Sequence, residues 1–214
     1  MAEEFHTFTL ENGIRVIHKE VPRAASHVSL VINAGSRDEL KNEGGVAHFI
    51  EHCLFKGTKK RKTYHILNRL ERVGGEINAY TTKEETWISA SFLERDMDRA
   101  IELISDIAFN STFPGKEIAK ERDVILDEIA SVMENPSDVI FDEFEERLFG
   151  RHPLGRTILG TPQSVKSLKK TDILEFVKHN YSPNQMVFAS VGSTPIKKLK
   201  RICEKYLSSF NSKG

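Results

Sequence analysis

The segment His48-Phe49-Ile50-Glu51-His52 holds the residue types best able to do chemistry in this chain. Two histidines four residues apart on a helix project from the same face, so both imidazoles can bind one metal ion. Glu51 precedes the second histidine and is not needed as a ligand. Its carboxylate can therefore take a proton from water activated by zinc. The segment predicts a zinc centre with Glu51 as general base.

A helical wheel separates this polar face from an apolar one. With His48 at zero and about 100° per residue, Glu51 falls at about 300° and His52 at about 40°. Six apolar residues fall between about 100° and 260°: Val46, Ala47, Phe49, Ile50, Cys53 and Leu54. Such a helix buries its apolar side and turns the polar residues toward a cleft. Two exposed helical histidines beside a surface glutamate are the simpler interpretation, and a third ligand would decide between the two.

Glu121 and Glu128 are the candidates for that third ligand. A catalytic zinc site usually has three protein ligands and a water. The two glutamates lie nearly two turns apart on a helix expected over residues 114–134. Both fall on one flank of its apolar stripe and should be half-buried at the edge of a cleft. Spacing alone leaves open whether either carboxylate is a ligand or only marks a charged helix boundary.

Strands and helices alternate around these residues. Period-2 patterns and turn residues predict strands at 5–10, 14–20, 27–35, 76–81, 86–93 and 186–192. Patterns with helical periodicity predict helices at 44–55, 62–73, 95–109, 114–134, 137–149, 171–180 and 195–210, with a loop at 151–162. Strands near both ends of the chain predict one α+β domain over 1–214, with a mostly antiparallel sheet packed against helices.

Composition narrows the class of protein. The 214 residues include 31 Lys and Arg, 31 Asp and Glu and 39% hydrophobic residues, as in ordinary globular proteins. The zero net charge argues against a nucleic-acid binder, and the basic run at 56–62 is typical of a solvated loop. Cys53 and Cys203 are expected to be free thiols. With no apolar run of membrane-spanning length and no secretory signal, we expect a cytoplasmic protein, or one in its mature form after export, without a membrane partner.

Four segments together resemble the inverted-motif zinc peptidases, the pitrilysin and insulinase family, with the processing-peptidase-like members nearest. They are HFIEHCLFKGT at 48–58, GGEINAYT at 74–81, ERDVILDEI at 121–129 and HPLGRTILGTP at 152–162. The resemblance implies that zinc is bound by His48, His52 and Glu128. It also implies that Glu51 is the general base and that Glu121 is a second catalytic carboxylate beside the ligands.

The same resemblance implies where substrate binds. Asn78 and Ala79 match an edge strand to which an extended peptide adds through backbone hydrogen bonds. Phe55 falls at about 340° on the wheel, on the face of the ligands. An exposed aromatic there is expected to line the wall beside the metal.

Length is where the chain departs from the family. Typical members join an active and an inactive domain in a longer chain, whereas only Asn211 to Gly214 follow Phe210 here. We therefore expect the single-domain, zinc-binding half of such a peptidase, working with a second homologous subunit, with another copy of itself or as one part of a longer chain. The expected function is a zinc-dependent endopeptidase subunit acting on peptides or unfolded segments. The alternative is a catalytically idle subunit of the same fold that binds peptides or supports an assembly.

Overall fold

The computed structural model describes residues 5–208 and 210 of this chain. Within them, six strands form one sheet: β1 (His6–Thr9), β2 (Arg15–Glu20), β3 (Ala25–Ile32), β4 (Glu76–Thr81), β5 (Thr86–Leu93) and β6 (Met186–Gly192). The strand order is β1-β2-β6-β3-β5-β4. Only β2 and β6 run parallel, and the other neighbours are antiparallel. The predicted mostly antiparallel sheet is confirmed.

The helices are α1 (Val46–Leu54), α2 (Thr63–Glu71), α3 (Met97–Asn110), α4 (Gly115–Glu134), α5 (Pro136–Phe149), α6 (Pro162–Ser167), α7 (Lys170–Asn180) and α8 (Ile196–Leu207). Short 3₁₀ turns lie at Ser36–Asp38, Glu94–Asp96, Pro153–Gly155 and Pro183–Gln185. Each predicted helix is present, with ends that differ by a few residues. The sequence analysis missed α6, because six residues are too short to show helical periodicity.

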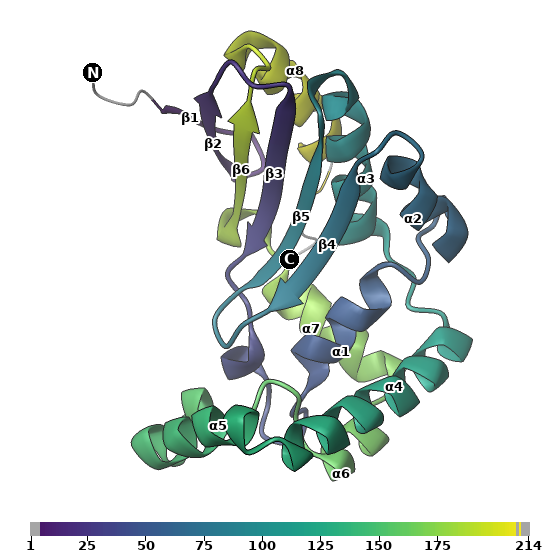
Figure 1. Ribbon diagram of the computed structural model, residues 1–214, viewed down its shortest axis with the longest axis vertical. Coiled ribbons are helices and arrows are strands. Elements are labelled where there is room, and N and C mark those ends of the chain that lie inside the picture. Colours follow the sequence, from purple (N-terminus) through teal and green to yellow (C-terminus); the bar gives the residue numbers. More distant parts are fainter. Residues whose placement is uncertain (1–4, 209, 211–214) are drawn as a thin grey trace.

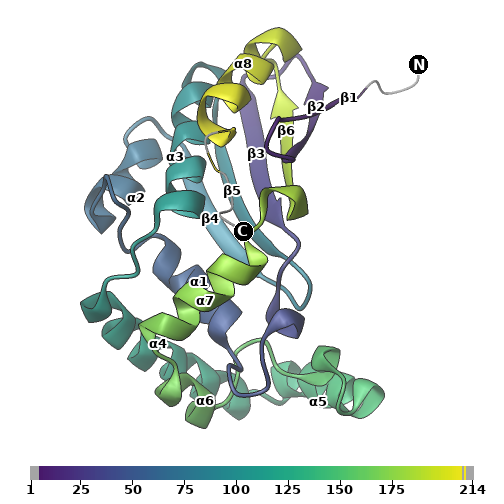
Figure 2. The same cartoon turned by 180° about the vertical axis from the view of Figure 1, so that it is seen from behind.

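One face of the sheet carries the helices α3 and α8, which lie behind the strands in Figure 1 and in front of them in Figure 2. Alternation along β5 shows why, since Ile88, Ala90 and Phe92 point to the buried side. At the lower end of the sheet, α1 packs against β4, α4 and α7. Helix α1, which carries His48 and His52, is therefore held from three sides.

Turn residues shape the β1–β2 hairpin and the connection from α2 to β4. Gly13 has φ +99°, and the side-chain oxygen of Asn12 accepts a hydrogen bond from the Ile14 amide at 3.3 Å. Gly74, with φ +77°, follows α2 and starts the return to β4. In the strand order, β4 is the last member, so one of its sides lies at the edge of the sheet.

Two further expectations concern the chain as a whole. Cys53 and Cys203 are buried and free, as predicted. Among the helices that the structure describes, none has the length and apolar character to cross a membrane. The residues after Phe210, on which the expectation about the chain's end was based, lie outside the described part of the chain.

Candidate metal centre

Helix α1 presents the two faces that the wheel predicts. All six apolar residues are buried, while Glu51 and His52 are half-buried. His48 is more enclosed than a cleft-facing residue would be, with 7% of its surface exposed, because α4 packs across this side of α1. The amphipathic pattern therefore aims the polar residues at α4 rather than at open solvent.

Glu39 fixes the start of α1. Its carboxylate accepts hydrogen bonds from the amides of Gly45 at 2.9 Å and Ala47 at 3.0 Å, which have no partner inside the helix. Burial raises the pKa of this carboxyl to about 8. Gly45 has φ +90°, and a Cβ there would lie 2.6 Å from the carbonyl oxygen of Leu159. The loop before α6 thus packs directly on the first turn of the ligand helix.

Three donor atoms converge between α1 and α4. Oε2 of Glu128 lies 3.4 Å from Nε2 of His52 and 3.8 Å from Nε2 of His48. One ligand atom from each residue lies within 4.8 Å of the other two. Two atoms bound to one tetrahedral zinc at about 2.0–2.1 Å are roughly 3.4 Å apart. The donor set therefore fits zinc in both its chemistry and its spacing.

The two histidines differ at their other ring nitrogen. Nδ1 of His48 is buried without a hydrogen-bond partner among the described residues, whereas Nδ1 of His52 lies 3.2 Å from Oε2 of Glu121. Burial, helped by the neighbouring His52, lowers the pKa of His48 to about 4. His48 is therefore neutral near pH 7, which is the form that binds a metal.

The two glutamates that spacing could not separate lie on opposite sides of His52. Glu128 lies beside both Nε2 atoms, and 40% of its side chain is exposed. Glu121 lies against Nδ1, and Nζ of Lys56 contacts its other oxygen at 2.7 Å. The distances favour Glu128 as the ligand and Glu121 as the partner of a ligand.

Glu51 lies close to these groups without joining the three-atom cluster. Burial raises the pKa of its carboxyl, an effect that Thr81 at the end of β4 and the charge of His52 partly oppose. A carboxyl with a raised pKa is better matched to accepting and returning a proton near neutral pH.

Two of the predicted substrate residues lie on the edge strand, and the third follows α1. Asn78 is exposed on β4, and its Oδ1 accepts a hydrogen bond from the amide of Ala79 at 2.9 Å. Ala79 turns its methyl group into the core. Phe55 follows α1 directly but is half-buried against the core, so less of its ring is available than the wheel predicts.

The basic run at 56–62 is not the uniformly solvated loop that the sequence predicts. Arg61 inserts between two acidic residues of α3, with distances of 2.7 and 2.8 Å to the Glu102 oxygens and 2.6 Å to Asp106. Lys59 and Lys60 are exposed. A charge run looks the same whether or not its members have partners, and these partners lie more than forty residues away. For the contact of Lys56 with Glu121, the local signal in the sequence is the position of Lys56 one turn after His52.

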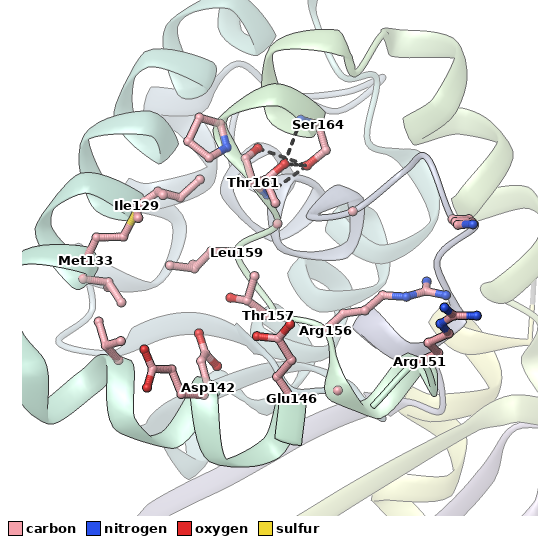
Figure 3. Close-up of a pocket in the computed structure, with 18 of the residues that line it drawn as sticks. Ile129, Met133, Asp142, Glu146, Arg151, Arg156, Thr157, Leu159, Thr161 and Ser164 are labelled. Carbon is pink, nitrogen blue, oxygen red and sulfur yellow. Dashed lines mark hydrogen bonds between the residues drawn. The ribbon is translucent and has the colours of Figure 1, made fainter. Parts of the chain in front are cut away.

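A separate cavity of about 820 Å³ lies between α4, α5 and the segment that leads into α6. Figure 3 shows Asp142 and Glu146 pointing into it from α5, opposite the apolar residues Ile129 and Leu159 of its wall.

 The cavity is lined by these acidic and apolar residues and by Arg151 and Arg156, rather than by the side chains of the metal centre. Leu159 lines this cavity and also packs, through its backbone carbonyl, on Gly45 at the start of α1.

Comparison with known proteins places these features in a family. The family model described as insulinase (peptidase family M16) matches residues 15–162, and the model of the M16 inactive domain matches residues 167–214. The chain is 37% identical to the mitochondrial-processing peptidase subunit beta of Neurospora crassa, over 94% of this chain and 43% of that protein. It is also 37% identical to an uncharacterized zinc protease of Mycobacterium leprae, over 96% of this chain and 46% of that protein.

Solved structures agree in fold. A protease from Helicobacter pylori superposes with a TM-score of 0.95 at 24% identity, over 99% of this chain and 52% of that one. The first half of the periplasmic protease PqqL from Escherichia coli gives a TM-score of 0.90 at 26% identity, over 99% and 47%. The chain thus spans about half the length of the relatives it matches. On the family model, the metal-site geometry and these likenesses, the chain belongs to the M16 (insulinase) family of zinc metallopeptidases.

Proposed function

We propose that this chain is the zinc-binding half of an endopeptidase that hydrolyses extended peptides or unfolded segments. The observation that carries the proposal is the convergence of His48, His52 and Glu128, with donor atoms within 4.8 Å of one another, on a helix that also bears Glu51. Membership of the M16 family supports the same reaction. We infer that residues 1–214 act as one zinc-binding unit.

In this proposal each residue has a distinct task. Nε2 of His48, Nε2 of His52 and a Glu128 oxygen would hold zinc, which would supply Lewis-acid polarisation of water and of the substrate carbonyl. Glu51 takes a proton from the attacking water and delivers it to the nitrogen of the departing amine, so that the amide bond is replaced by a carboxyl and an amine. Oε2 of Glu121 accepts a hydrogen bond from Nδ1–H of His52 and keeps Nε2 of that ring turned toward the metal.

The edge strand β4 supplies the place for substrate. An extended peptide can pair with β4 because no described strand covers its outer side. The amide of Ala79 is bound by the side chain of Asn78, and a peptide carbonyl would take the place of that side chain. The exposed part of Phe55, directly after the ligand helix, would contact a substrate side chain on the metal side.

A second homologous half completes the enzyme in this proposal. The chain spans 43% and 46% of two curated relatives, so their remaining length corresponds to at least one further unit. An open site would lack the exclusion of water that strengthens electrostatic stabilisation of the transition state. The second half is a separate homologous subunit, a second copy of this chain or a continuation of the same polypeptide. Light scattering of the assembly purified from its native host, with mass spectrometry of its components, distinguishes these three arrangements.

The test uses that native assembly and a quenched-fluorescent peptide library. We expect Glu51→Gln to retain zinc and to lose at least about a hundredfold in turnover, the lower range for removing a general base. His48→Ala and Glu128→Gln should instead lower the zinc content itself. Full activity in the zinc-loaded Glu51→Gln protein would refute the assignment of the base. A wild-type assembly that binds zinc and peptides but does not hydrolyse them would favour the catalytically idle alternative.

A further inference from the structure

Lys56 is connected to the metal centre through Glu121. Its Nζ lies 2.7 Å from Oε1 of Glu121, and the other oxygen of that carboxylate lies 3.2 Å from Nδ1 of His52. The side chains of Lys56 and Glu121 are 26% and 10% exposed. A continuous polar path therefore runs from the loop after α1, through a buried carboxylate, to one of the imidazoles.

The backbone of Lys56 is fixed on both sides. Its amide donates to the carbonyl of Cys53 at 3.1 Å, and its own carbonyl accepts from the hydroxyl of Thr63 at 3.1 Å. Five residues later, Arg61 anchors the same loop to α3. Lys56 therefore leaves a held backbone and has a half-buried side chain, whereas Lys60 of the same run is exposed.

We propose that Lys56 is a positioning residue for the metal centre. It holds one oxygen of Glu121, so that the other oxygen faces Nδ1 of His52 and the ring directs Nε2 toward the metal. This inference rests on the proposed function, in which His52 is a zinc ligand. The physical reason is that a hydrogen-bonded partner of a ligand histidine fixes the tautomer and orientation of the ring. A buried carboxylate that loses its cation turns toward other partners.

The sign of the effect separates this role from simple charge repulsion. A lysine near a cation site repels the cation, so its removal through charge alone would strengthen zinc binding. Loss of the Glu121 orientation would weaken zinc binding. A weaker site after removal of a positive charge is therefore specific to the positioning role.

The first experiment measures zinc affinity by chelator competition in Lys56→Met, Lys56→Arg and the matched control Lys60→Met. We expect Lys56→Met to bind zinc about 3–10-fold more weakly, less than the 10–100-fold typical of a direct partner of a ligand, because Lys56 acts one step further away. Lys56→Arg, which keeps the charge and the ion pair, should stay within about twofold of wild type. Unchanged or tighter binding in Lys56→Met, or an equal loss in Lys60→Met, would overturn the proposal.

The second experiment combines Lys56→Met with Glu121→Gln in a double-mutant cycle. If Lys56 acts through Glu121, Lys56→Met should cause no further weakening once Glu121 is replaced. The same factor of weakening in both backgrounds would show that Lys56 acts by another route. Thermal unfolding of each metal-free variant identifies any that are misfolded, and Lys56→Gln then serves as the second variant.

The third experiment needs no metal. Nitrogen NMR of the His52 ring in metal-free protein should show the tautomer with the proton on Nδ1 in wild type, and a smaller fraction of it in Lys56→Met. An unchanged tautomer fraction would contradict the proposal. The NMR measurement also tests the positioning role of Lys56 separately from the proposed function. Zinc affinity that is unaffected by His48→Ala would contradict the proposed zinc site, whereas the tautomer fraction would still test the link from Lys56 to His52.

Discussion

Replacing Arg61 by methionine should destabilise the fold far more than replacing an arginine of a surface ion pair. The guanidinium makes three short contacts to Glu102 and Asp106, and the exposed fractions of the three side chains are 17%, 12% and 1%. Removing one partner of a buried ion pair costs about 3–5 kcal/mol, because the remaining charge stays buried. Water reaches Arg61 and Glu102 in part, so we expect about 3 kcal/mol, the lower end of that range. For a chain of this size that loss lowers the melting temperature by roughly 6–12 °C.

Urea unfolding followed by the fluorescence of Trp87, the single tryptophan, measures this loss. Arg37→Met is the matched control, because Arg37 pairs with Glu84 at the surface, where side chains are 35% and 56% exposed and a pair contributes at most about 1 kcal/mol. Neutralising the partners as well, in Arg61→Met with Glu102→Gln and Asp106→Asn, should recover at least about 1 kcal/mol. An Arg61→Met variant no less stable than Arg37→Met would refute the reasoning.

Two further predictions concern substrate and pH. Ala79→Pro removes the amide N–H that is hydrogen-bonded to the side chain of Asn78. It should leave zinc affinity unchanged and lower kcat/KM for extended peptides about tenfold, which is the effect of one lost hydrogen bond. Ala79→Gly is the control, and unaltered kinetics in a folded Ala79→Pro variant would count against strand pairing. The pKa of Glu39 rises from 4.5 in the unfolded chain to about 8 in the fold, so the native state holds an extra proton between these values. The free energy of unfolding should therefore fall as pH rises through this window, and it should depend less on pH in Glu39→Gln. Urea midpoints at about pH 5 and pH 8 measure this dependence in both proteins. Equal pH dependence in the two proteins would contradict a raised pKa at Glu39.

The parts of the fold that the sequence predicted well are those with local signals. The hairpin of β4 and β5 has the predicted bounds, because alternation and the polar turn specify it without help from distant residues. The apolar face of α1 was also predictable, since its apolar residues all lie on one side, whereas the burial of His48 on the other face was not. Ends of helices differed where capping and short 3₁₀ turns decide them, as before α3.

The features that residue spacing could not predict depend on how the helices pack against one another. Spacing placed Glu121 and Glu128 on the same flank of α4, but which one reaches Nε2 of His52 is decided by the packing of α4 on α1. The partners of Lys56 and Arg61 lie on α4 and α3, far along the chain. Arg61 has no local feature that distinguishes it from the exposed Lys59 and Lys60, and Lys56 differs from them only in lying one turn after His52.

The edge strand β4 brings a hazard as well as a binding surface. Unpaired backbone groups at a sheet edge attract the strands of other copies, which is a common route to aggregation. In this chain the Asn78 side chain covers the outward amide of Ala79, and the exposed Glu76 places a charge at the start of the strand. A chance encounter between two copies must displace Asn78, and a parallel encounter in register would also place two Glu76 carboxylates side by side. The edge therefore discriminates against self-association while remaining open to a peptide that offers a carbonyl in the right register.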